Sequence, residues 1–215
     1  MDGQRDWNGT LGTGWTAVAA GVLLMVSTGV ELVHEVQAPS GRVVEPVTYA
    51  ALVAMWGLAM VGVARTFLFF RALHTGADVG LTRAGRVGVR SGVLGAVLQV
   101  AFALVSLITA AATGSPWEGA FLFFGLGFLA LIVGGIALGF GLRRSGVLRT
   151  AAVPLWSGSA AAVLAIVIGV DPWHDIALFG YYASWIAVGL LFMRGSRALA
   201  AVSENTGAAA SPSSL

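Results

Sequence analysis

The chain has 215 residues, of which 57% are hydrophobic and 10% are charged, and its formal net charge is +2. Soluble domains carry about 25% charged residues, so this composition excludes an ordinary soluble domain and indicates a membrane protein. The chain contains no cysteine, which excludes disulfides, thiolate metal sites and thiol catalysis.

Six apolar runs, each close to the length of about 20 residues that a helix needs to cross a bilayer, predict an all-α, polytopic membrane protein. They form one predicted transmembrane domain over residues 15–197, so no separate soluble domain is expected. Residues 1–14 form a polar N-terminal segment, and the small, polar residues of 198–215 predict a disordered tail. The predicted spans are about 15–35, 47–71, 89–112, 119–142, 150–170 and 174–193.

The arginines predict the orientation of these spans. Ten of the twelve basic residues lie before the first span, between spans two and three, between spans four and five, or after span six. Cytoplasmic loops carry the excess of basic residues, which predicts three consecutive hairpins with both termini in the cytoplasm. This topology explains the arginines without a nucleic-acid partner and places them near anionic lipid head groups. All twelve are arginine, and alanine, glycine and valine are abundant, which indicates a GC-rich bacterial genome and therefore the bacterial inner membrane.

The first span ends in three ionisable residues, Glu31, His34 and Glu35. Residues three and four apart share one face of a helix, so these side chains are predicted to form one patch. At 1.5 Å per residue, Glu31 lies roughly 6 Å inside the outer end of the predicted span. Ionisable groups at membrane depth are costly and indicate function, so this patch is the first candidate for an ion or ligand site.

The middle spans contain two isolated polar side chains. Arg65 is the only arginine well inside an apolar run, and its long side chain can snorkel to the cytoplasmic interface; a buried ion pair or a gate is the alternative. Gln99, near the centre of span three, predicts a hydrogen bond to a neighbouring helix, with a pathway residue as the alternative. Both are secondary ligand candidates. Gly135 and Gly139 of span four form a G-x-x-x-G pair, which predicts the close approach of another helix.

The later outer turns add four ionisable side chains at the level of the first-span patch. His174 and Asp175 join the main site candidates, and Glu118 and Asp171 are secondary candidates. Each outer turn also has a proline before or at the start of the returning span, which fits three diverged copies of one hairpin: Pro46, Pro116 and Pro172.

Three functions fit this outer cluster. Carboxylates beside a histidine favour a site for a proton or a cation, in transport or sensing, and this is the function that we predict. Glu31, His34 and His174 can instead hold a metal such as zinc, or His34 and His174 a haem, in a membrane enzyme. The third alternative is an accessory or assembly protein, acting with a membrane partner or as a homo-oligomer, whose outer charges are solvated helix ends. No motif implies a cofactor, a substrate or a reaction.

Overall fold

The fold is all-helical. The computed structural model describes residues 2–34, 36–37, 40–75, 82–145, 149–169 and 173–209, and the side chains of 11–34, 36–37, 40–72, 82–144, 149–169 and 173–194. Six of its helices are long and apolar enough to cross a membrane, as predicted. The elements are α1 (Asp2–Val33), α2 (Pro46–Thr75), α3 (Arg83–Thr113), α4 (Ala120–Ser145), the 3-10 helix η1 (Arg149–Ala151), α5 (Ala152–Ile168) and α6 (Trp173–Ala209).

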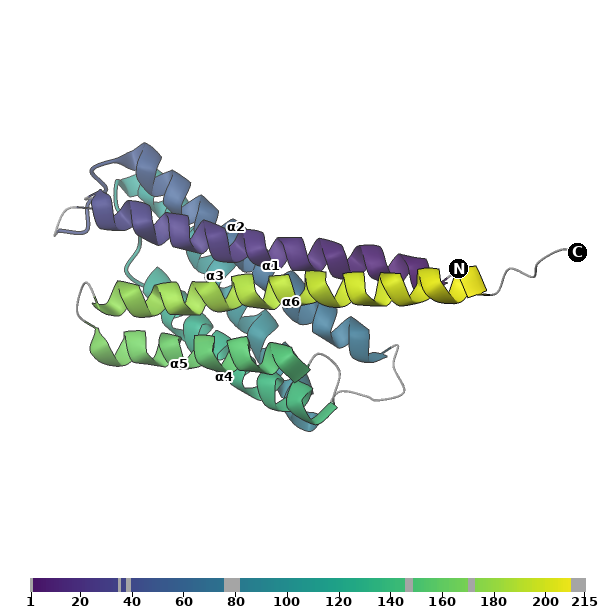
Figure 1. Cartoon of the computed structure of the whole chain (residues 1–215). Coiled ribbons are helices and arrows are strands. Elements are labelled where there is room, and N and C mark those ends of the chain that lie inside the picture. Colours follow the sequence, from purple (N-terminus) through teal and green to yellow (C-terminus); the bar gives the residue numbers. More distant parts are fainter. Residues whose placement is uncertain are drawn as a thin grey trace, which may run out of the picture.

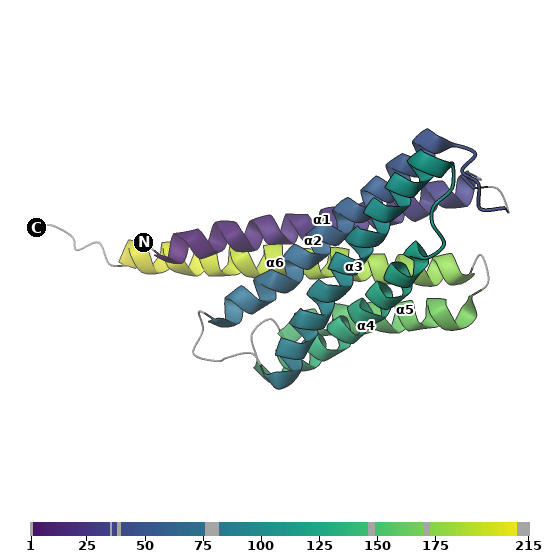
Figure 2. The same cartoon turned by 180° about the vertical axis from the view of Figure 1, so that it is seen from behind.

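The six helices form a closed ring in chain order. Each helix packs against the one before it and the one after it, and α6 packs against α1. Figures 1 and 2 show α1 and α6 side by side, with α3 and α4 on the other side of the bundle. Short connections alternate between two ends, so consecutive helices are antiparallel, which agrees with the predicted hairpins.

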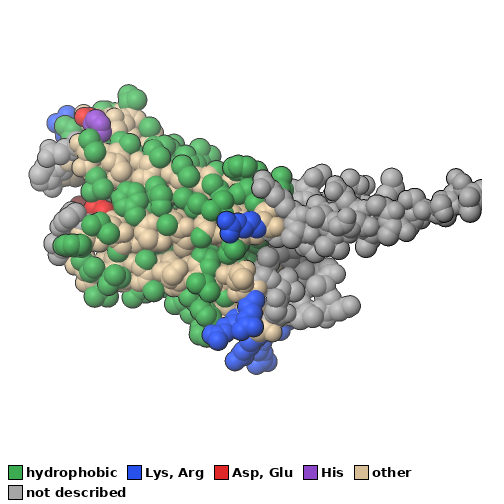
Figure 3. Space-filling view, in the orientation of Figure 1, with side chains coloured by type: hydrophobic (Ala, Val, Ile, Leu, Met, Phe, Trp, Pro, Cys, Tyr) green, Lys and Arg blue, Asp and Glu red, His purple; other side chains and the backbone are tan. Residues whose placement is uncertain are grey.

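The two ends differ in charge (Figure 3). At one end, here called the acidic end, α1, α3 and α5 finish and α2, α4 and α6 begin. It carries Glu31, Glu45, Glu118 and Asp175, together with Arg42. The opposite end, here called the arginine end, carries Arg71, Arg83, Arg86, Arg143, Arg144 and Arg149. The cytoplasmic location of the arginine end remains a prediction from the loop charges.

Three helix boundaries differ from the sequence-based ones. α3 begins at Arg83, six residues before the predicted span, because the Thr82 hydroxyl accepts a hydrogen bond from the Gly85 N–H (3.2 Å) and caps the helix. α1 is helical from Asp2, which extends it through the predicted N-terminal segment. α6 continues to Ala209, into the tail for which the sequence predicts disorder. The alanines and the leucine after residue 197 favour helix, and no proline interrupts the sequence up to Ala209.

Glycines bring α1 and α6 into close contact. A Cβ added at Gly21 would lie 2.8 Å from the backbone oxygen of Tyr182, and one at Gly14 would lie 2.9 Å from that of Gly189. These distances are too short for a side chain, so only glycine permits this approach. In a membrane, close van der Waals packing of this kind replaces the hydrophobic effect as the force that joins helices.

The contact between α3 and α4 depends on glycines at seven-residue intervals on α4: Gly127, Gly134 and Gly141. A Cβ at Gly134 would lie 2.7 Å from the Cα of Gly92 on α3. The predicted G-x-x-x-G pair faces the opposite neighbour, since Gly135 and Gly139 lie against α5. The prediction that this pair admits another helix is confirmed, and α5 is that helix.

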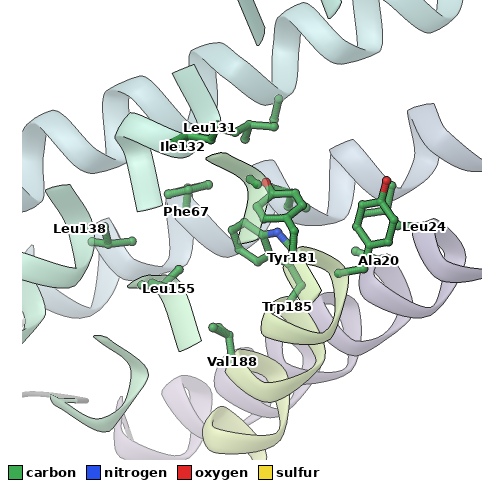
Figure 4. Close-up of a cluster of buried hydrophobic side chains, with 14 of the residues drawn as sticks. Ala20, Leu24, Phe67, Leu131, Ile132, Leu138, Leu155, Tyr181, Trp185 and Val188 are labelled. Atoms are coloured by element: carbon green, nitrogen blue, oxygen red, sulfur yellow. The ribbon is translucent and has the colours of Figure 1, made fainter. Parts of the chain in front are cut away.

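The centre of the bundle towards the arginine end is filled with apolar side chains (Figure 4). Phe67 and Phe70 of α2 and Phe192 of α6 have no exposed surface. The Phe70 and Phe192 rings lie 5.0 Å apart, and Phe67 lies edge-on to Trp185 at 5.4 Å between centroids. The interior towards the arginine end therefore contains an aromatic plug, here defined by Phe67, Phe70 and Phe192.

Candidate functional site

The acidic end begins where α1 stops. The helix ends at Val33, and the chain then turns, with the Val36 N–H donating to the His34 backbone oxygen (2.9 Å). This turn buries Val36 in a second apolar cluster with Tyr49 and Leu52 of α2. The predicted first span extends to residue 35, whereas α1 ends at Val33. Glu35 itself lies outside the described residues.

His34 is the first residue after α1, and it pairs with the start of α2. Its ring Nδ1 lies 3.8 Å from Glu45 Oε2, and the two side chains remain 51% and 46% exposed. Exposed ion pairs of this kind contribute about 0–1 kcal/mol, so the pair adds little to stability. The pair spans the loop between α1 and α2, so His34 lies at the rim of the acidic end.

Glu31 lies in the last turn of α1, above the hydroxyl groups of two tyrosines. Its carboxylate interacts electrostatically with Tyr49 of α2 and with Tyr182 of α6. Asp175, in the first turn of α6, acts on the same Tyr182 hydroxyl. The sequence placed Glu31 and Asp175 at one level, and the fold places them at the same end of the neighbouring helices α1 and α6. Glu31 is exposed and so belongs to the mouth of the site, whereas Tyr182 has no exposed surface.

Tyr182 connects this mouth to the interior. The Thr28 hydroxyl donates to the Tyr182 hydroxyl oxygen (3.3 Å), which leaves the phenolic proton for another acceptor. The Tyr182 ring contacts the Trp56 ring edge-on, with 6.2 Å between centroids. The Trp56 indole N–H in turn donates to Gln99 Oε1 at 2.9 Å. A line of polar and aromatic groups therefore runs from Glu31 to the middle of the bundle.

Gln99 ends this line at the centre of α3. It has no exposed surface, and its amide Nε2 donates to the Phe124 backbone oxygen of α4 at 2.8 Å. The prediction that Gln99 hydrogen-bonds to a neighbouring helix is confirmed. Its amide bonds to two neighbours, α2 and α4. Because both ends of the amide have partners, Gln99 holds α2, α3 and α4 together around the inner end of the line.

Three buried polar atoms near this line have no hydrogen-bond partner within the described part of the chain: Ser106 Oγ, Tyr181 Oη and Trp185 Nε1. Ser106 neighbours Tyr49, and Trp185 neighbours Tyr181, but neither pair has the geometry of a hydrogen bond. An unsatisfied buried polar group costs about 1–3 kcal/mol, so this interior retains hydrogen-bonding capacity that its own side chains do not use.

The remaining predicted residues lie apart from this line. His174 has its ring Nδ1 2.9 Å from the Ala165 backbone oxygen, where it can add a second hydrogen bond to a carbonyl that already accepts from the Gly169 N–H. Glu118 is exposed before α4, and Arg65 is exposed with its guanidinium beside Gly12 of α1. Asp171 lies outside the described residues. Within the described ranges, no three His, Asp or Glu side chains come together as a metal site would require, so Glu31, His34 and His174 do not form one.

Sequence reasoning did not assign a role to Tyr49, Trp56 or Tyr182. The signal was present, because a tyrosine or tryptophan well inside an apolar span must find a partner for its polar atom. The sequence does not show which helices are neighbours, so it could not identify the hydrogen-bond partner of each side chain. No family model matches the chain, and neither a curated protein nor a solved structure resembles it.

Proposed function

We propose that this integral membrane protein senses protons or a small monovalent cation at its acidic end. The observation that supports the proposal is that Glu31, at the end of α1, and Asp175, in the first turn of α6, lie at the same end of two helices that pack against each other, with the buried Tyr182 one step further in. Two carboxylates at the same end of neighbouring helices repel each other, and a bound proton or cation between them relieves that repulsion.

Binding at this position can be transmitted through the ring of helices. An ionised Glu31 carries a negative charge that a protonated Glu31 lacks, so the two states differ in the electrostatic field at the Tyr182 hydroxyl. Tyr182 contacts Trp56, which is held by Gln99. A change at the mouth therefore reaches α2, α3 and α6 through direct contacts.

Sensing is favoured over conduction because the polar line stops at the middle of the bundle. Beyond Gln99, the aromatic plug fills the interior towards the arginine end with side chains that have no exposed surface. A proton or a hydrated cation needs polar partners along its whole route. The side chains of the plug are phenylalanines, which offer no polar group.

Intrinsic fluorescence tests the proposal, because the Trp56 ring touches Tyr182. Wild-type protein in nanodiscs is titrated with acid, and separately with Na⁺ and K⁺ at fixed pH. We expect the emission to change with pH or cation in the wild type, and the change to disappear in Glu31→Gln and in Trp56→Phe. The matched control is Glu118→Gln, which removes an exposed carboxylate away from the tyrosines and should titrate like the wild type. A Glu31→Gln titration identical to the wild-type one would refute the proposal.

Flux measurements separate sensing from transport. Proteoliposomes of the wild type and of Glu31→Gln are assayed for proton and cation uptake. We expect both to match protein-free liposomes, because the plug closes the route. Uptake that requires Glu31 would show that the plug opens, and transport would replace sensing as the function.

A further inference from the structure

A groove on the lipid-facing side of the bundle lies between α4 and α5, at the arginine end. It encloses about 540 Å³ and is lined by Ile136, Phe140 and Arg143 of α4 and by Trp156, Ala160 and Val163 of α5. From Ile136 to Arg143 the groove follows about 10 Å of helix, against a leaflet of about 15 Å of hydrocarbon. Its length therefore suits the upper part of one acyl chain.

Direct contacts hold the walls of this groove in place. The Trp156 indole N–H donates to the Ile136 backbone oxygen at 3.2 Å, and its ring lies 5.0 Å from that of Phe140. Arg143 folds over the same indole, with 5.6 Å from Cζ to the ring centroid. Glycine at position 139 permits the arrangement, because a Cβ there would collide with the indole nitrogen of Trp156. These contacts give the groove a preformed aromatic wall, with the Arg143 guanidinium at the end nearer the membrane surface.

The arginines at this end have no carboxylate partner among the side chains that the structure describes. No arginine whose side chain the structure describes forms an ion pair with a described carboxylate. The four carboxylates with described side chains lie at the acidic end, a bilayer thickness away. Arg144, next to Arg143, reaches a second, smaller groove of about 340 Å³ on the other side of Phe140. Two adjacent guanidinium groups thus stand at the membrane surface beside apolar grooves.

We propose that the groove between α4 and α5 binds an anionic phospholipid of the leaflet at the arginine end. Arg143, with Arg144 beside it, binds the lipid phosphate, and one acyl chain lies between Phe140 and Val163. A guanidinium suits phosphate because its fixed N–H groups match the phosphate oxygens, and basic pockets between spans select anionic head groups. The apolar length of the groove favours a lipid over a free phosphate ion. The site is independent of the proposed sensing function, which lies at the other end.

Thermal unfolding of delipidated protein in detergent tests this assignment, with dioleoylphosphatidylglycerol as the probe and dioleoylphosphatidylcholine as the neutral comparison. We expect the anionic lipid to stabilise the wild type more than the neutral lipid does. In Arg143→Gln its apparent affinity should fall about fivefold, the contribution of one basic residue at an anionic membrane surface. Ala160→Phe, which fills the exposed groove without changing charge, should weaken binding of the same lipid as well.

The controls decide between a lipid site and general charge attraction. Arg42→Gln removes an exposed arginine at the acidic end and should leave the lipid affinity unchanged. Glycerol phosphate carries the anionic group without the chains and should not stabilise the protein. The assignment is overturned if Arg143→Gln binds the lipid as the wild type does, if Arg42→Gln weakens it equally, or if glycerol phosphate stabilises as well as the lipid.

Discussion

Replacing Gly134 by alanine should separate α3 from α4. The new Cβ would lie 2.7 Å from the Cα and N atoms of Gly92 and 3.1 Å from the backbone oxygen of Gly88. Carbon atoms in contact are about 3.5–4.0 Å apart, so the helices must move apart by about 1 Å. Because the obstructing atoms are backbone, no rotamer change can relieve the collision. Overpacking of this kind costs about 1–3 kcal/mol, and we expect the free energy of unfolding to fall by that amount.

Gly125→Ala, on the same helix, is the matched control. A Cβ at Gly125 meets nothing within 4 Å, so the substitution adds no collision. Alanine is favoured over glycine in a helix by up to about 1 kcal/mol, so this variant should be as stable as the wild type or slightly more stable. Unfolding by SDS in mixed micelles, followed by circular dichroism, gives both values. Equal midpoints for Gly134→Ala and Gly125→Ala would refute the close approach of α3 and α4.

Three further predictions concern polar contacts and orientation. Gln99→Leu leaves the Trp56 indole N–H without its acceptor and should lower the free energy of unfolding by about 1–3 kcal/mol. In the double variant with Trp56→Phe the two losses should be less than additive; full additivity in the SDS titration would contradict the hydrogen bond. His174→Phe removes the donor to the end of α5 and should lower the unfolding temperature, and an unchanged temperature would show that the contact contributes nothing. Because the chain has no cysteine, an impermeant maleimide should label Arg42→Cys in intact cells but Thr150→Cys only after lysis, and the reverse pattern would invert the predicted orientation.

Much of the architecture could be predicted from local sequence, because a span is defined by the length and apolarity of one continuous run. The alternating direction of the spans also predicted that Glu31 and Asp175 lie at the same end of the bundle. The boundaries were less accurate, since they depend on local contacts such as the Thr82 cap and on the burial of Val36. The helical continuation to Ala209 was missed because small, polar residues were taken as a sign of disorder.

The site itself required the tertiary structure. The sequence grouped Glu31 with His34 and His174, whereas the fold pairs His34 with Glu45 and turns His174 towards α5. In a soluble protein, the apolar face of each helix would have indicated its buried side. Here the helices are apolar on every side, because lipid and protein interior demand the same side chains.

The sequence alone therefore determined how many helices are long and apolar enough to cross a membrane, roughly where each begins and ends, and which end of the bundle collects the acids and which the arginines. Only the tertiary structure decided that α6 closes the ring on α1, that Gly134 faces α3 while Gly139 faces α5, and that Tyr182 contacts Thr28 and Trp56. The physical reason is that hydropathy records depth in the bilayer, whereas the neighbour of each helix is selected by the close fit of small side chains, which hydropathy does not record.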